Sequence, residues 1–124
     1  MAEKKSEFLI ETDIILDYLT GNDSSVISEL MTEGTCFTSV FNVSELYMHC
    51  QTETEQNAVR DVLNALHILG IPARYGLYTG EYSGKFTNVR DQLFCVLAEK
   101  ANLTIVTKDS EKYRDTGLNI YQKV

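Results

Sequence analysis

The sequence has little cysteine and almost no proline. Its three cysteines, Cys36, Cys50 and Cys95, are widely spaced, odd in number and include no Cys-x-x-Cys pair. These features argue against a disulfide framework and against a zinc ribbon, and they fit reduced thiols in a cytosol. Apolar residues lie beside each cysteine, so we expect all three to be packed as small hydrophobic side chains. The single proline, Pro72, and the lack of repeats or linker-like stretches indicate one domain that spans residues 1–124.

Long hydrophobic runs are also absent. Residues 1–7 mix lysines with glutamates and lead into only three apolar residues, at 8–10. A signal peptide needs a longer apolar region and a small-residue cleavage site. No run approaches the roughly 20 apolar residues that span a bilayer. We therefore expect a soluble cytoplasmic protein with no contact to a membrane.

Positive charge is scarce, because 11 lysines and arginines face 18 acidic residues and the net charge is −7. This balance disfavours a protein that holds nucleic acid through a broad basic face. It does not exclude a nuclease. A cluster of carboxylates can bind divalent cations, and those cations then carry the positive charge that meets phosphate.

What the sequence does contain is an alternation of strand and helix patterns. Apolar, β-branched runs predict strands at residues 7–11, 35–40, 103–107 and 118–121. Apolar residues at helical spacing predict helices at residues 42–50 and 54–69, and one more between residues 24 and 34, where Gly34 is expected to end it. Helices are also predicted at residues 14–19 and 88–101. The stretch 73–86 is ambiguous, because its tyrosines are helically spaced but its glycines weaken a helix. The alternation favours an α/β fold, a three-layer α/β/α arrangement around a mainly parallel sheet of four to five strands.

Polar residues stand at or just after the ends of three predicted strands. They are Glu11, Ser39 and Asp109. In parallel α/β sheets, ligands bind outside the carboxyl ends of the strands. We therefore expect these residues to gather at one edge of the sheet and to mark the functional site.

Four segments carry polar residues in a distinctive order. They read LIETDIILDYL (9–19), TSVFNVSEL (38–46), RDQLFCVLA (90–98) and LTIVTKD (103–109). Together they resemble the PIN-domain family, and within it the single-domain VapC-type toxins. Those chains place Asp-Thr-Asn or Asp-Thr-Asp after the first strand, then a segment with Ser and Glu-Leu, then an Asp that begins an apolar helix, then a strand that ends Val-Thr-x-Asp. The resemblance covers nearly the whole chain and implies a PIN-like fold.

The resemblance also implies a site and a reaction. Carried over by position, the family's acidic quartet falls on Glu11, Glu45, Asp91 and Asp109. In that family the quartet holds one or two Mg²⁺ or Mn²⁺ ions and the enzyme hydrolyses RNA. Hard divalent cations prefer such oxygen ligands, and a metal held there can polarise the phosphate and activate a water. Candidates for groups that aim these ligands are Thr12, Asp13, Ser39 and Thr107.

The same resemblance implies partners. VapC-type toxins form homodimers and are neutralised by a small antitoxin protein whose peptide arm covers the acidic pocket. Apolar side chains of the first three predicted helices suit such contacts, and packing in the core is the competing use for them.

One position departs from the family pattern, because Glu11 stands where the family normally has Asp. Glutamate is longer by one methylene, so with an unchanged backbone its carboxylate reaches about an ångström further, a shift that can cost around a hundredfold in rate. Three outcomes stay open: the pocket compensates, Asp13 takes over ligation, or catalysis is weakened. The alternative function is accordingly a PIN-like module with attenuated catalysis that binds RNA or protein.

Some of these residues have plainer interpretations. Asp91 suits a helix start, where the helix dipole favours an acid, and Asp109 suits a turn. Basic residues flank the acidic segments and either contact RNA phosphates or merely offset surface charge. These candidates for RNA contact are Lys85, Arg90, Lys108, Lys112 and Arg114.

Overall fold

The computed structural model describes residues 6–122; residues 1–5 and 123–124 of the predicted domain lie outside the described residues. Within 6–122, a single all-parallel sheet has the strand order β3-β2-β1-β4. The strands are β1 (Ser6–Ile10), β2 (Gly34–Ser39), β3 (His67–Leu69) and β4 (Thr104–Val106). The α-helices are α1 (Thr12–Thr20), α2 (Ser25–Glu33), α3 (Val40–Met48), α4 (Glu53–Asn64) and α5 (Val89–Lys100). Two 3₁₀ helices, η1 (Ala73–Tyr82) and η2 (Ser110–Tyr113), complete the secondary structure of the described residues. The predicted α/β fold with a parallel sheet is confirmed.

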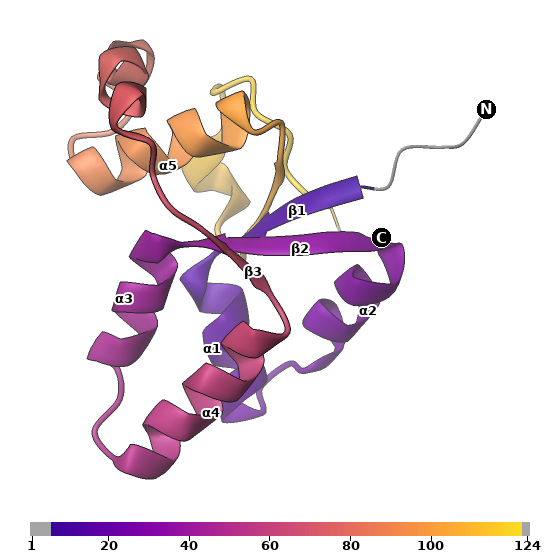
Figure 1. Ribbon diagram of the computed structural model, residues 1–124. Coiled ribbons are helices and arrows are strands. Elements are labelled where there is room, and N and C mark those ends of the chain that lie inside the picture. The colour runs from indigo at the N-terminus through magenta and orange to yellow at the C-terminus, as the bar shows by residue number, and fades with distance from the viewer. Residues whose placement is uncertain (1–5, 123–124) are drawn as a thin grey trace.

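Helices cover both faces of the sheet. Helices α1 to α4 lie on one face, and α5 lies on the other with the C-terminal segment (Figure 1). Strand β1 shows why, because successive side chains of a strand point to opposite faces. Phe8 and Ile10 belong to the core beneath α1 to α4, whereas Leu9 belongs to the core beneath α5. A strand that is apolar on both faces suits the centre of a parallel sheet.

Gly34 allows β1 and β2 to approach closely at their first residues. A Cβ atom at this position would lie 2.0 Å from the backbone oxygen of Ser6, which is paired with Gly34 in the parallel ladder. Only a residue without a side chain fits there. The glycine that was expected to end the second helix therefore also begins the second strand.

One predicted helix is too long. The prediction of a helix over 54–69 is wrong at its end, because α4 stops at Asn64 and residues 67–69 form β3 beside β2. Leu66 and Leu69 stand at helical spacing, but Leu66 packs beneath α1 to α4 and Leu69 packs on the opposite core. A short apolar run fits both a helix and a strand, and here pairing with Phe37–Ser39 decides the matter.

Two other stretches also differ from expectation. Residues 118–121 were predicted to form a strand, but they make only an isolated parallel bridge between Ile120 and Ile105. The ambiguous stretch 73–86 contains η1, a 3₁₀ helix that leads into α5. No helix among the described residues is both long and apolar enough to cross a bilayer.

The cysteines behave as expected from their apolar neighbours. Cys36 and Cys95 are buried, Cys50 is partly buried, and all three are free thiols. Burial raises the pKa of Cys36 to about 11 and that of Cys95 to about 12. Both buried thiols therefore stay protonated and inert near neutral pH.

Candidate active site

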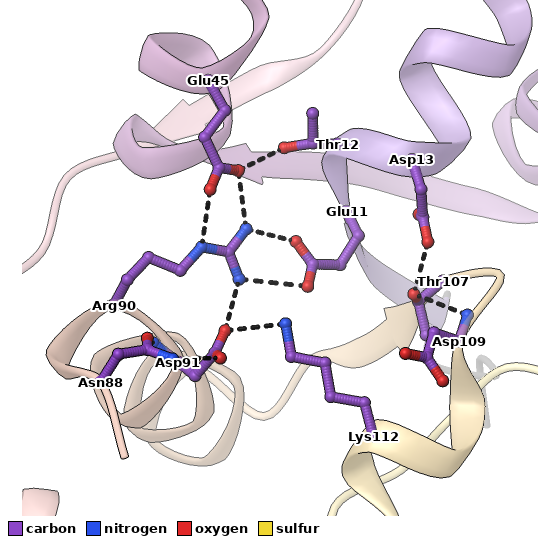
Figure 2. Close-up of a pocket in the computed structure, with 10 residues that line it drawn as sticks. All are labelled: Glu11, Thr12, Asp13, Glu45, Asn88, Arg90, Asp91, Thr107, Asp109 and Lys112. Carbon is purple, nitrogen blue, oxygen red and sulfur yellow. Dashed lines mark hydrogen bonds and ion pairs between the residues drawn. The ribbon is translucent and has the colours of Figure 1, made fainter. Parts of the chain in front are cut away.

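A polar pocket opens where β1 and β4 end and where α1 and α5 begin. Its volume is about 420 Å³, and carboxylates and cations face one another across it (Figure 2). It is lined by Glu11, Thr12, Asp13, Glu45, Asn88, Arg90, Asp91, Thr107, Asp109 and Lys112. The structure thus brings together all four predicted acidic residues at the carboxyl edge of the sheet.

Glu11 is placed by the end of β1. It follows the last residue of the strand in an extended conformation, and its backbone N–H donates to the oxygen of Val106 at 2.9 Å. The residue is only 5% exposed. A buried carboxylate requires partners, and Glu11 has three: Asn42, Arg90 and Tyr113.

Ser39 contacts the pocket indirectly, through Asn42. It caps α3, because its hydroxyl accepts from the N–H of Asn42 while the Asn42 side chain accepts from the Ser39 backbone. This capping box fixes the Asn42 amide. The amide then donates to Glu11 at 3.0 Å and to Thr12 at 2.9 Å. Ser39 therefore supports Glu11 through Asn42 and does not line the pocket itself.

Glu45 enters from α3, which begins directly after β2. Its carboxylate accepts from the Thr12 hydroxyl at 2.6 Å, so the first turn of α1 orients it. The side chain of Glu45 is 36% exposed, much more than the 7% of Glu11. Glu45 is therefore the member of this pair that faces the pocket opening.

Asp91 enters from the first turn of α5. Asn88 caps that helix by accepting from the backbone N–H of Asp91 at 2.8 Å, and its amide donates to the Asp91 carboxylate at 2.8 Å. One residue therefore both starts the helix and orients the acid. The interpretation of Asp91 as a helix-start acid is correct, and the side chain faces the pocket as well.

Arg90 lies between the carboxylates (Figure 2). Its guanidinium donates two hydrogen bonds to Glu11, at 2.6 and 3.1 Å, and two to Glu45, at 2.8 and 3.1 Å. A fifth bond, of 3.2 Å, reaches Asp91. Its Cζ atom also stands 4.8 Å from the centre of the Phe94 ring. Paired, fork-like contacts of this kind are the strongest that arginine makes with carboxylates.

Lys112 supplies the second cation of the pocket. Its ammonium lies 2.8 Å from the Asp91 carboxylate. It comes from η2, whose next residue, Tyr113, donates its hydroxyl proton to Glu11. The C-terminal part of the chain therefore contributes to the same network.

Asp13 and Asp109 occupy the other side of the pocket, around Thr107 (Figure 2). The Thr107 hydroxyl donates to Asp13 at 2.9 Å and accepts from the backbone N–H of Asp109 at 3.1 Å. The second Asp13 oxygen is buried and makes no hydrogen bond with the described residues. Asp109 is exposed, so it stands at the rim.

The cations lower the pKa values of the buried acids. Burial raises the pKa of Glu11, but the hydrogen bonds and charge of Arg90, with help from Tyr113 and Lys112, outweigh burial and hold this pKa below its ordinary value. Burial also opposes ionisation of Asp91, but bonds to Lys112 and Asn88 and the charge of Arg90 lower its pKa. Both residues are therefore carboxylates near neutral pH.

Three of the predicted RNA-contact residues lie outside the pocket lining. Lys85 donates to the backbone oxygen of Asp115, and Lys108 pairs with Asp17 at 2.9 Å. Arg114 is 71% exposed and pairs with Glu111. Of the predicted basic set, Arg90 and Lys112 are the side chains that pair with members of the acidic quartet.

The site fits a divalent metal in its donor chemistry but not in its spacing. Glu11, Glu45 and Asp91 offer the carboxylate oxygens that Mg²⁺ and Mn²⁺ prefer. The positive charges of Arg90 and Lys112 stand among these oxygens. Within residues 6–122, no three or more His, Cys, Asp or Glu side chains are gathered closely enough to share one ion.

Three residues of this network were not anticipated from the sequence. Asn42 has a signal, since it is the third residue after Ser39 and completes a capping box. Asn88 has one too, since it precedes an apolar helix. Tyr113 has none, because it lies 102 residues after Glu11 and only the fold brings the two together.

The fold and the site together define a class of protein: α/β domains with a parallel sheet and a carboxylate-lined pocket at the carboxyl edge of that sheet. The chain belongs to the PIN domain family, whose match covers residues 8–117. The resemblance drawn from the four sequence segments is therefore confirmed. No curated protein sequence matches the chain.

Solved structures share this fold. VapBC2 from Rickettsia felis, bound to a DNA fragment from its promoter, has a TM-score of 0.79 at 20% identity and covers 93% of this chain and 97% of its own. A toxin–antitoxin complex from Klebsiella pneumoniae has a TM-score of 0.76 at 13% identity, with 94% and 99% covered. FitAcB from Neisseria gonorrhoeae has a TM-score of 0.73 at 16% identity, with 93% and 96% covered. At such identities these matches show a common fold.

Proposed function

We propose that this chain is a metal-dependent endoribonuclease that hydrolyses phosphodiester bonds of RNA, and that it is the toxin of a toxin–antitoxin pair. The observation that carries the proposal is the convergence of Glu11, Glu45 and Asp91, with Asp109 at the rim, in one pocket of a PIN domain. Four acids from four separate segments of the chain meet where a parallel α/β fold binds its ligands.

The roles follow from the surroundings of each acid. Glu11, Glu45 and Asp91 are the residues that would hold Mg²⁺ or Mn²⁺, and Asp109 would complete the set from the rim. When bound, the metal supplies positive charge to the phosphate and a water of lowered pKa. Thr12 and Asn88 orient two of the acids through hydrogen bonds of 2.6 and 2.8 Å. Asn42 and Tyr113 do the same for Glu11.

The biological setting is part of the proposal. Several structures with this fold are described as VapBC or as toxin–antitoxin complexes. We infer that this chain likewise pairs with a small antitoxin protein and forms a homodimer in the cytoplasm. Co-expression with the product of a neighbouring small gene, followed by co-purification, tests the pairing.

A cleavage assay tests the reaction. Purified protein is incubated with structured RNA in Mn²⁺ or Mg²⁺, and wild type is compared with Asp91→Asn. We expect Asp91→Asn to cleave about a hundredfold more slowly, because it removes a charged ligand from the pocket. Asp61→Asn, at an exposed position of α4, is the matched control and keeps wild-type activity. Equal rates for wild type and Asp91→Asn contradict the assignment.

A second candidate function is an attenuated PIN-like module that binds RNA or protein. The cations inserted among the acids favour it, as does Glu11 in place of the usual Asp. Glu11→Asp separates the two functions. If wild type is inactive and Glu11→Asp cleaves RNA, the natural chain is attenuated; if Glu11→Ala cleaves as well as wild type, Glu11 has no part in catalysis.

A further inference from the structure

Arg90 makes more hydrogen bonds in the pocket than a single surface ion pair provides. A guanidinium has five N–H donors. Hydrogen bonds to Glu11, Glu45 and Asp91 engage all five of them. The Arg90 side chain is 22% exposed and rests over the Phe94 ring. Such full engagement fixes both the position and the plane of the guanidinium.

The charges of the network balance as they would with a metal. The carboxylates of Glu11, Glu45 and Asp91 contribute about three negative charges, and Arg90 and Lys112 contribute two positive ones. A single divalent cation would also contribute two positive charges. The acids are therefore neutralised to the same extent without any ion, which explains why three carboxylates can stand together in this fold.

The two occupants exclude each other. A metal ion needs oxygens of Glu11 and Glu45, and both oxygens of each carboxylate accept hydrogen bonds from Arg90. Arg90 also stands between these carboxylates, so they cannot gather around one ion while the guanidinium remains (Figure 2).

We propose that Arg90 is an autoinhibitory residue that competes with the divalent metal for Glu11 and Glu45, so that metal loads only when the guanidinium leaves the pocket. The inference rests on the proposed metal-dependent function and adds a regulatory step to it. Arg90 lies in the first turn of α5, at the edge of the pocket. Rotation of its side chain toward solvent therefore frees the acids without moving the sheet.

Metal binding without any substrate tests the competition. Mn²⁺ is titrated calorimetrically into wild type, Arg90→Met and Arg90→Lys. Methionine keeps an unbranched side chain over Phe94 but has neither charge nor N–H donors. A site that is open for only a small fraction of the time binds with an affinity reduced by that fraction. We expect Arg90→Met to bind Mn²⁺ at least about tenfold more tightly than wild type, with Arg90→Lys in between.

Arg60→Met is the matched control. Arg60 is an exposed residue of α4 that contacts Asn57, so this variant changes the net charge by the same amount far from the acids. We expect its Mn²⁺ affinity to stay within about twofold of wild type, because exposed charges at a distance are screened by salt. If Arg60→Met gains as much affinity as Arg90→Met, net charge explains the effect and the competition is refuted.

Thermal unfolding gives a second readout. Removal of one partner from a buried ion pair destabilises the fold, so Arg90→Met is expected to melt below wild type in EDTA. Because a ligand stabilises the state that binds it, saturating Mn²⁺ should raise the Tm of Arg90→Met more than that of wild type. Where Arg90→Met fails to fold, Arg90→Lys decides by the same two measurements.

The possible outcomes separate this inference from the proposed function. Tighter Mn²⁺ binding by Arg90→Met without RNA cleavage supports the competition and refutes the ribonuclease. Equal or weaker binding by Arg90→Met, while wild type binds Mn²⁺ and cleaves RNA, refutes the competition alone. If neither wild type nor Arg90→Met binds Mn²⁺, the competition and the metal-dependent function are both refuted. Arg90 then occupies the place of a metal permanently.

Discussion

Glu11 is the residue that ties the pocket together. The longer side chain meets Arg90 through two hydrogen bonds and accepts a third from Tyr113, which is a buried hydroxyl of η2. A single carboxylate therefore connects the end of β1 to α5 and to the C-terminal part of the chain. At the position where the chain departs from the family pattern, the carboxylate is thus held by Arg90, Tyr113 and Asn42.

The stability of the protein should depend on pH through this residue. The pKa of Glu11 lies below its ordinary value of 4.5, so between these two values the unfolded chain binds a proton that the folded chain does not. The stabilisation is therefore complete above about pH 4.5 and is lost as the pH falls through the lowered pKa. Asp91 acts in the same direction below its ordinary value of 3.8.

Urea unfolding between pH 7 and pH 3 measures this effect. We expect the free energy of unfolding of wild type to be nearly constant at first and to fall below about pH 4.5. Glu11→Gln should start less stable by about 3 kcal/mol, because Arg90 then keeps its burial but loses a charged partner. Its loss of stability on acidification should also be smaller. A Glu11→Gln curve parallel to that of wild type contradicts the assignment.

Among single residues, the acids were predictable, as was Thr12, which donates to Glu45, but the part that Arg90 plays among them was not. Glu11, Glu45, Asp91 and Asp109 stand in ordered motifs, and the pocket contains all four. Arg90 was named only as a candidate to contact RNA. A sequence cannot tell whether an arginine beside an acid points to solvent or into a pocket, because the deciding partners lie 45 and 79 residues away.

At the scale of elements, the start of α5 links helix stability to the site. Asn88 caps this helix and also holds the Asp91 carboxylate. Asn88→Ala should cost about 1 kcal/mol in the free energy of unfolding, as loss of an N-cap does. It should also weaken RNA cleavage, because Asp91 loses a bond that orients it.

Thr52→Ala provides the control for this prediction. Thr52 caps α4 in the same way, by accepting from the N–H of Glu55 at 3.1 Å, but it lies outside the pocket lining. We expect a similar loss of about 1 kcal/mol in chemical unfolding and an unchanged cleavage rate. If both variants lose the same activity, the effect of Asn88 is one of stability alone.

Gly34 provides a second prediction at this scale. Gly34→Ala would place a methyl group 2.0 Å from the Ser6 backbone oxygen, so β1 and β2 would have to separate at their first pair. We expect a loss of about 3 kcal/mol in urea unfolding. Gly70→Ala meets no atom within 4 Å and should change stability by less than about 0.5 kcal/mol. Near-wild-type stability of Gly34→Ala would contradict this close approach.

The elements themselves were largely predictable, and the exceptions share a cause. Long helical segments such as α5 were recognised from their own residues. β3 and the bridge at Ile120 are short, and each exists through pairing with a neighbouring strand. Local patterns cannot report a partner that only the fold brings near.

At the scale of the whole molecule, the parallel sheet and its two helical layers followed from one regularity, whereas the strand order came only from the structure. Strand and helix patterns alternate along the chain, which requires parallel strands and helices on both faces. The order β3-β2-β1-β4 places β1 in the interior of the sheet beside β4. The two strands are far apart in the sequence, since the paired residues Leu9 and Ile105 are 96 positions apart. This neighbourhood is what brings Glu11 near Thr107 and Asp109.

The Arg90 network has a consequence for the lifetime of the folded chain. It joins residues separated by 45 and 79 positions, and contacts between such distant residues demand costly loop closure. We expect it to form after the transition state of folding, so that it governs mainly the rate of unfolding. Stopped-flow measurements in urea should show Arg90→Met unfolding about tenfold faster than wild type, with a refolding rate that changes less than about twofold. Arg90, the side chain that occupies the acidic pocket, would then also set how long each molecule stays folded before it first unfolds.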